Sequence, residues 1–277
     1  MILLLDAGNS RLKWALLRHG HFERGGVFEH SGEAIKELAS AAWAELDIPE
    51  SVWVANVGGE PLRRALNSWV RRHWKLTPEY VVADAELFGI HNAYAEPARL
   101  GVDRWLALLA ARELFKGPLC IVDCGTALTI DALGLDNRHL GGLIIPGLQL
   151  MRDALVGRAE SIREQMQVAS HEQVRLLGAD TGSAVVGGTL YAQVAVIDRV
   201  LADLRAELGA SLRCVLTGGD APGLLPLLAT RAHYEADLVL LGLARIARSR
   251  TTETVRPVEA EVSTPAEIIA PAAENPL

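Results

Sequence analysis

The sequence has few cysteines and no surplus of positive charge, and each shortage argues against a class of function. The 277 residues include three cysteines, Cys120, Cys124 and Cys214, and no two of them form a CxxC pair. This argues against a cysteine-based metal site and favours buried free thiols in a reducing cytosol. The formal net charge is −7 at pH 7, which argues against nucleic acid as the main partner.

Long apolar runs are also lacking. No apolar stretch looks long enough to span a bilayer, and Asp6 interrupts the apolar run at the N-terminus, which shows no charged region or cleavage site of a signal peptide. We therefore expect a soluble, cytoplasmic protein with no membrane partner. Hydrophobic residues make up 50% of the sequence, enough for a sizeable core in one large or two modest domains.

The most informative stretch covers residues 119–131 and reads LCIVDCGTALTID. An apolar run typical of a buried strand ends at Asp123, Gly125 breaks it, and a second strand-like run follows from Ala127. The turn brings a carboxylate, a glycine backbone and the Thr126 hydroxyl together. Phosphate-binding loops need this combination, because glycine lets backbone N–H groups approach the anion while the carboxylate holds a cation beside it. Taken alone, the motif fits a hairpin turn with a solvated Asp equally well.

A second copy of the same format covers residues 3–17 and reads LLLDAGNSRLKWALL. An apolar strand leads to Asp6 and Gly8, and an alternating strand follows. Two copies indicate duplicated halves and are too few for a solenoid. Two acidic glycine turns that face each other across a cleft would hold one polyphosphate from both sides, which predicts a nucleotide site. Lys13 would reach a terminal phosphate as a point charge, and the alternative is a solvated strand lysine.

Hydrophobic periodicity predicts alternating strands and helices. Strands are expected near residues 1–5, 11–18, 21–28, 51–57, 80–83, 119–122, 127–133, 139–145 and 212–216, and helices near 33–46, 61–74, 102–115, 148–156, 181–208 and 236–248. This order indicates an α/β fold with mixed sheets. Ser31 and Thr181 are the expected N-caps of their helices. Residues 158–177 are expected to form a mobile or interface element, and residues 251–277 a disordered tail.

Two shorter stretches add candidate site residues. Asp103 and Arg104 fall in the first turn of a predicted helix, where they suit a general base beside a carboxylate-binding guanidinium. Asp103 fits a helix-capping role equally well. The glycine pair in TGGD, residues 217–220, follows a predicted strand and precedes a helix, where open α/β sheets bind ligands.

The order of these elements resembles the type III pantothenate kinases. The matching stretches are DAGNSRLK at 6–13, GVDR at 101–104, DCGTALTID at 123–131, GGLIIPG at 141–147 and TGGD at 217–220. That family belongs to the superfamily of acetate kinase, sugar kinases, Hsp70 and actin. The resemblance implies duplicated ribonuclease-H-like domains with mixed sheets flanked by helices and a nucleotide cleft between them. We place these domains at residues 1–115 and 116–250.

The resemblance also implies an activity and a set of site residues. The family phosphorylates pantothenate with ATP to give 4'-phosphopantothenate, the first step of coenzyme A synthesis, using Mg²⁺ and a monovalent cation, K⁺ or NH₄⁺. Asp103 would be the catalytic base and Asp123 the ligand of the monovalent cation. The ATP site would comprise Asp6, Ala7, Gly8, Asn9, Ser10, Arg11, Leu12, Lys13 and Thr126, and the pantothenate pocket Tyr94, Gly101, Val102, Asp103 and Arg104.

Thr181 would reach pantothenate across the interface of a homodimer. The family pattern around it is Asn-Thr-x-x-Ala-Ile, whereas residues 180–185 here read DTGSAV. Two rival hypotheses remain open. One is another kinase or a phosphohydrolase on the same fold. The other is a regulatory ATP-binding protein without catalysis, since some members are known as Bvg accessory factors, although the set of Asp6, Lys13, Asp103 and Asp123 argues against it.

Overall fold

Two five-stranded sheets of the same topology form the framework. The structure is a computed structural model that describes residues 1–30, 35–157 and 177–255. The first sheet has the order β3-β2-β1-β4-β5 and the second the order β10-β9-β8-β11-β12. In each sheet the first three strands in the chain pair antiparallel and the last two continue in parallel. The predicted duplication with mixed sheets is therefore confirmed.

The strands of the two sheets occupy equivalent places in the two halves. The first sheet comprises β1 (Ile2–Ala7), β2 (Arg11–Arg18), β3 (His21–Glu29), β4 (Ser51–Asn56) and β5 (Glu79–Tyr80). The second comprises β8 (Leu119–Cys124), β9 (Ala127–Leu133), β10 (His139–Pro146), β11 (Arg213–Thr217) and β12 (Ala232–Tyr234). A two-stranded ribbon, β6 (Glu86–Leu87) and β7 (Ile90–His91), and the short 3₁₀ helices Pro97–Arg99 and Leu225–Leu227 complete the connections.

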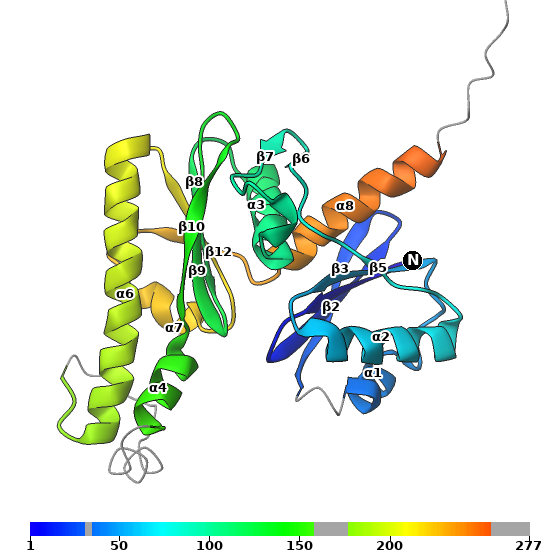
Figure 1. Ribbon diagram of the computed structural model, residues 1–277, viewed down its shortest axis with the longest axis horizontal. Coiled ribbons are helices and arrows are strands. Elements are labelled where there is room, and N and C mark those ends of the chain that lie inside the picture. Colours follow the sequence, from blue (N-terminus) through cyan, green and yellow to red (C-terminus); the bar gives the residue numbers. More distant parts are fainter. Residues whose placement is uncertain (31–34, 158–176, 256–277) are drawn as a thin grey trace, which may run out of the picture.

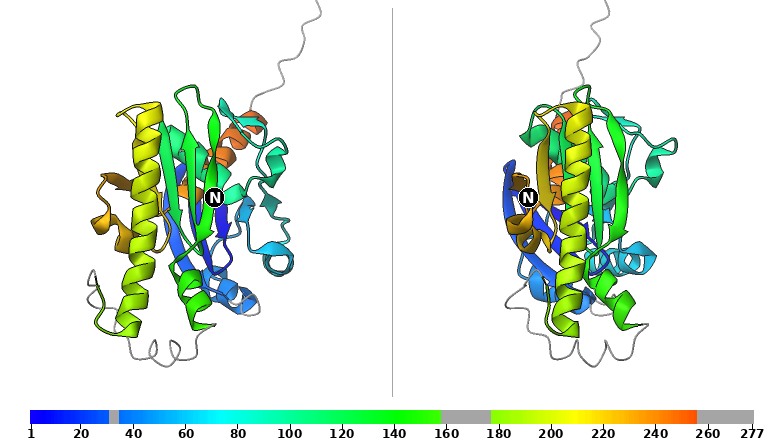
Figure 2. Two further views of the ribbon diagram at one scale, coloured as in Figure 1. Left: turned by 60° about the vertical axis from the view of Figure 1, so that its left-hand side comes forward. Right: turned by 90° about the vertical axis from the view of Figure 1, so that its left-hand side faces the viewer.

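Helices cover both faces of the sheets, and two of them are shared. The helices are α1 (Ile35–Trp43), α2 (Gly59–Trp74), α3 (Val102–Leu114), α4 (Leu148–Val156), α6 (Thr181–Leu208), α7 (Ala221–Leu224) and α8 (Leu238–Val255). Helices α3 and α8 pack on each other between the two sheets (Figure 1). Helices α1 and α2 lie on the outer side of the first sheet, and α6 runs along the outer face of the second (Figure 2).

The central strands are buried on both faces, which explains their continuous apolar runs. Successive side chains of a strand point to opposite faces. In β1, Leu4 therefore packs into the core around α3 and α8, whereas Leu3 and Leu5 pack against α1 and α2. In β8, Ile121 joins the shared core and Val122 packs against α6. The three cysteines are free and buried, as predicted.

Several boundaries differ from the prediction. The strand expected at 80–83 pairs only over Glu79–Tyr80. Helix α8 extends to Val255 and so includes the first residues of the predicted tail. The N-cap of α6 is Asp180, whose side chain accepts the N–H of Ser183, and Thr181 is the first helical residue instead. Ser31, most of the 158–177 segment and residues 256–277 lie outside the described residues.

Helix α6 corrects the expectation that no apolar stretch is long enough to span a bilayer. The helix is 28 residues long and contains an 18-residue window of mean hydropathy 1.3, so by length and composition alone it is long and apolar enough to cross a membrane. Half of that stretch is buried inside the protein. The core helix of a globular protein passes the same test, and the core residues Leu190, Val194 and Ile197 of α6 pack on the second sheet.

Candidate active site

A cleft between the two sheets collects the predicted phosphate loops. Its lining comes from both halves of the chain and comprises Asp6, Gly8, Asn9, Ser10, Arg11, Lys13, Val57, Asp103, Asp123, Gly125, Thr126, Ala127, Thr129, Gly218, Gly219 and Val239. The two glycine turns thus face each other, as the duplicated motif predicts. Of the predicted ATP residues, Ala7 and Leu12 are buried in the core and do not line the cleft.

The first loop joins β1 to β2 and positions a carboxylate beside a lysine. Asp6 lies opposite Lys13 in the β1–β2 register. Burial is the main cause that raises the pKa of Asp6 to about 7, the charge of Lys13 lowers it, and Asp123 and Asp103 raise it further. The Lys13 Nζ donates a hydrogen bond of 2.9 Å to the carbonyl of Ala236, next to the start of α8. Lys13 is therefore held at the cleft rather than solvated on the strand.

The second loop joins β8 to β9 and repeats the carboxylate. Burial raises the pKa of Asp123 to about 6, with Asp103 raising it further and Lys13 and Arg11 lowering it. Gly218 adopts a φ of +92°, and a Cβ there would clash with the Asp123 side chain and the Cys124 carbonyl. The TGGD glycine therefore allows the β11 turn to approach the carboxylate directly, which a larger residue would prevent.

The two loops touch across the cleft. The hydroxyls of Ser10 and Thr126 lie 3.0 Å apart. The guanidinium of Arg11 lies against Gly219, where any side chain would overlap with it. The first loop therefore contacts both the second loop and the glycine pair at the end of β11.

Asp103 enters the cleft from α3. The N-cap of this helix is Gly101, which makes no side-chain capping hydrogen bond of its own. Asp103 accepts the backbone N–H of Arg104 at 2.8 Å, and its carboxylate also lines the cleft. Burial raises its pKa, while the hydrogen bond and charge of Arg104 lower it. The capping alternative and the base hypothesis therefore both have a basis in the geometry, because one carboxylate oxygen binds the helix end.

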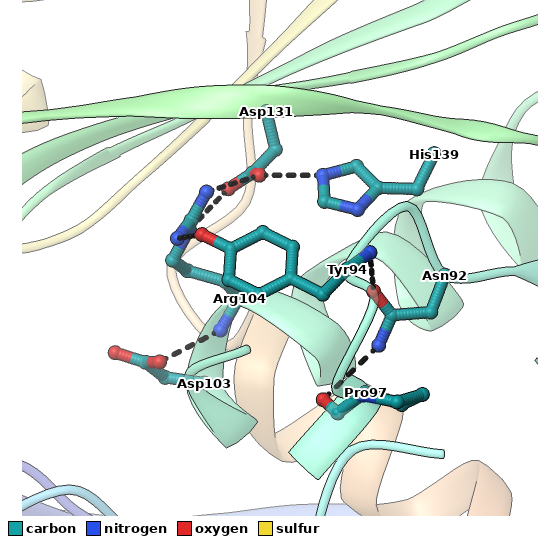
Figure 3. A network of polar contacts seen from close by, with 7 residues as sticks. All are labelled: Asn92, Tyr94, Pro97, Asp103, Arg104, Asp131 and His139. Carbon is teal, nitrogen blue, oxygen red and sulfur yellow. Dashed lines mark hydrogen bonds and ion pairs between the residues drawn. The ribbon is translucent and has the colours of Figure 1, made fainter. Parts of the chain in front are cut away.

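The Arg104 side chain does not line the cleft and belongs to a buried polar network (Figure 3). Its Nε and Nη2 atoms donate to the two carboxylate oxygens of Asp131 at 2.8 and 2.6 Å, and Nη1 donates to the Tyr94 hydroxyl at 3.0 Å. The Nε2 atom of His139 lies 2.8 Å from Asp131 Oδ1. Burial alone would lower the pKa of Arg104. The hydrogen bonds and charge of Asp131 outweigh burial, so the pKa of Arg104 is raised above its ordinary value.

The residues that the sequence predicts to bind pantothenate lie at several places outside the cleft lining, except Asp103. The Arg104 side chain donates a hydrogen bond to Tyr94, and the Arg104 backbone N–H donates one to Asp103. Gly101 and Val102 lie at the start of α3, and none of these four lines the cleft. Thr181 begins α6 and is also absent from the cleft lining.

Sequence reasoning missed Asp131, His139, Val57, Thr129 and Val239. The motif at 123–131 includes Asp131, and a charged residue in an apolar strand is a signal that could have identified it. Val239 lies on α8, and no local pattern connects this helix with the first loop.

The charge of the cleft fits a bound cation. Asp6, Asp103 and Asp123 face only the positive charges of Lys13 and Arg11 among the lining residues. Across the described residues, no group of three or more His, Cys, Asp or Glu side chains could hold a metal ion alone. Mg²⁺ in phosphate-transfer sites is bound by one or two carboxylates together with substrate phosphates, and this donor set suits it.

Comparison with known proteins agrees with this geometry. Among solved structures, an ethanolamine utilization protein EutJ from Carboxydothermus hydrogenoformans aligns with a TM-score of 0.52 at 14% identity, over 87% of this chain and 88% of that one. A putative Baf family transcriptional activator from Campylobacter jejuni aligns with a TM-score of 0.50 at 18% identity, over 91% of this chain and 99% of that one. At these identities the likeness shows the fold alone.

The sequence relatives are more specific. A type III pantothenate kinase from Nitrosococcus oceani is 45% identical over 253 residues, covering 90% of this chain and 94% of that protein. One from Burkholderia thailandensis is 38% identical, covering 89% and 98%. The family pattern of type III pantothenate kinases matches residues 2–203. The chain therefore belongs to the type III pantothenate kinase family.

Proposed function

We propose that this protein transfers the γ-phosphoryl group of ATP to pantothenate, giving 4'-phosphopantothenate and ADP in the cytoplasm as the first step of coenzyme A synthesis. The observation that supports this most directly is the cleft in which two acidic glycine loops face each other beside Asp103. Phosphoryl transfer depends mainly on positioning and charge neutralisation, and this arrangement supplies both.

Each loop has a part in the proposed reaction. Backbone N–H groups of the glycine turns and the Lys13 ammonium bind the phosphates. Asp103 takes the proton from the pantothenate hydroxyl while that oxygen attacks the γ-phosphorus and ADP leaves. The raised pKa of Asp103 makes it a stronger base than an exposed carboxylate. Mg²⁺ near Asp6 and K⁺ or NH₄⁺ near Asp123 would neutralise the developing charge on the phosphates.

We also infer a homodimer that completes the substrate pocket. Strand β10 is at the edge of the second sheet and exposes Leu140, Leu143 and Ile144, the last at 66%. An exposed apolar edge strand invites pairing with another chain. On α6, Thr181, Ala184 and Gly188 share one helical face, and Ala184 and Gly188 are exposed. Thr181 would thus face the partner's pocket rather than its own.

The test is an assay of ADP formation by the purified protein with ATP and Mg²⁺, with and without pantothenate and K⁺. We expect turnover that requires pantothenate and rises with K⁺ or NH₄⁺. ADP formed equally without pantothenate would indicate a phosphohydrolase. ATP binding without turnover would favour a regulatory protein.

A separate measurement tests the homodimer. Light scattering should give twice the protomer mass, and the Ile144→Lys variant should have the mass of the monomer.

A further inference from the structure

Arg104 is fixed in one orientation by Asp131 and by Tyr94, which lies in the segment between β7 and α3. The residue is 6% exposed and Asp131, on β9, is 2% exposed. The bidentate pair that they form uses one N–H each of Nε and Nη2, and Tyr94 takes one N–H of Nη1. A guanidinium has five N–H groups, so one on Nη1 and one on Nη2 remain for another acceptor.

His139, on β10, connects the two partners of Arg104. Its side chain is fully buried, and its Nε2 must carry the proton in order to donate to the Asp131 carboxylate. Its ring stacks on Tyr94, with centroids 6.2 Å apart and an interplanar angle of 14°. His139 therefore contacts both Asp131 and Tyr94, the two residues that bind the Arg104 guanidinium.

Gly142 covers the ion pair from β10. A Cβ at this position would lie 2.5 Å from Arg104 Nη2 and would clash with Asp131 Oδ1. The backbone of β10 can pass over the pair only because no side chain is present. Any larger residue there must displace the guanidinium, the carboxylate or the backbone carbonyl of Ile130 on β9, which a Cβ would also clash with.

Burial alone does not explain this arrangement. A buried ion pair is weak evidence for stability, because removing two charges from water costs about as much as their attraction returns. What bidentate pairing does provide is a fixed direction for the remaining donors. The backbone N–H of Arg104 binds Asp103, so the fixed guanidinium belongs to the residue next to the proposed base.

We propose that Asp131, His139 and Gly142 are positioning residues that act through Arg104, orienting its free N–H groups toward bound pantothenate. This inference rests on the proposed function, in which Arg104 contacts pantothenate. Asp131 orients the guanidinium, His139 holds Asp131 and Tyr94 together, and Gly142 leaves room for the pair. None of the three touches the reacting atoms.

The test compares steady-state kinetics of Asp131→Asn, His139→Gln, His139→Leu and Gly142→Ala in the full-length protein. We expect the KM for pantothenate to rise about tenfold or more in Asp131→Asn and Gly142→Ala, as when one partner of a buried charge pair is lost. The KM for ATP should stay within about twofold. His139→Gln retains an N–H donor, so its KM should lie closer to wild type than that of His139→Leu.

Two control variants separate positioning from stability. Arg112 lies on the same helix, is also buried, and donates to the backbone carbonyls of Gly117 and Gly134. Arg112→Gln should lower the melting temperature without changing the KM for pantothenate. Gly223 has open space where an added methyl group would lie, so Gly223→Ala should change neither property.

The outcomes distinguish this inference from the proposed function. If Arg104→Gln leaves the KM for pantothenate unchanged, Arg104 does not contact substrate and the premise fails. If Arg104→Gln raises it but folded Asp131→Asn and Gly142→Ala do not, the positioning role is wrong while the proposed function stands. A rise in both KM values in parallel with the melting-temperature loss would indicate a structural role only. If Asp131→Asn does not fold, the His139 pair and Gly142→Ala decide the question.

Discussion

At the scale of single residues, Asp103 has two roles to reconcile, because its carboxylate binds the N-terminus of α3 and also lines the cleft. A positioned base contributes about 10²–10⁴-fold to rate. We therefore expect Asp103→Asn to lose turnover by a factor in that range while it retains ATP affinity, since the amide oxygen still accepts the Arg104 N–H. Coupled measurement of ADP release and calorimetric ATP binding checks both. The control is Asp203→Asn, at a surface pair with Arg199. Near-normal turnover of a folded Asp103→Asn variant would remove Asp103 from the base role.

The buried carboxyl group of Asp6 lowers the stability of the folded protein at neutral and higher pH. Its pKa in the folded protein is about 7 against 3.8 for the ordinary carboxyl. The folded state thus holds this proton more tightly than the unfolded state, so the free energy of unfolding falls as pH rises from about 4 to about 7. Asp6→Asn should remove that loss and stabilise the protein at pH 8 by on the order of 1–3 kcal/mol, but not at pH 4.

Urea unfolding at both pH values, without nucleotide or metal, measures the effect. Asp180 provides a control of opposite sign, because hydrogen bonds from Ser183 lower its pKa. Its contribution is present at neutral pH and lost as pH falls, so Asp180→Ala should destabilise the protein at pH 8 and less in acid. A less stable Asp6→Asn variant at pH 8 would show that the buried carboxylate is compensated in the folded state.

At the scale of elements, α3 belongs to both halves. It packs on α8 and contacts β4 of the first sheet and β8 and β9 of the second. Trp105 on this helix is fully buried in the shared core. Trp105→Ala should therefore cost about 3–5 kcal/mol and weaken both halves together in one transition. Urea unfolding followed by circular dichroism tests this against Ile48→Ala, where the side chain is 66% exposed and the expected change is within about 0.5 kcal/mol. Two separate transitions would contradict a shared core.

Elements defined by local patterns are predictable from the sequence, and those defined by distant packing are not. The strand Arg11–Arg18 and the hairpin that contains it follow from alternation and a glycine turn. Both acidic loops of the cleft follow from the same pattern repeated. Local patterns fix a helix end only to within a residue: the expected N-cap Thr181 is wrong because Asp180, one residue earlier, can also accept the Ser183 N–H. The Arg104 network joins α3, β9 and β10, and no local window of sequence contains all three.

At the scale of the whole molecule, the contacts between the two loops leave little room for a nucleotide. The cleft has a volume of about 150 Å³, whereas sites for small molecules usually measure about 300–1,000 Å³. The Ser10–Thr126 hydroxyl contact and Arg11 against Gly219 close it from opposite halves. We therefore expect ATP to separate these contacts when it enters, through a hinge motion of the two halves about α3 and α8.

A crosslink between the loops tests this requirement for opening. The Ser10 and Thr126 hydroxyl oxygens are 3.0 Å apart, so Ser10→Cys combined with Thr126→Cys places two sulfurs where a disulfide can form. The natural cysteines are buried, which favours selective oxidation of the new pair. We expect the oxidised double variant to lose ATP binding and a reductant to restore it, because reduction frees the loops without changing any residue. Each single variant should bind ATP equally before and after oxidation. Unchanged ATP affinity in the fully crosslinked protein would show that the nucleotide enters without separating the two loops.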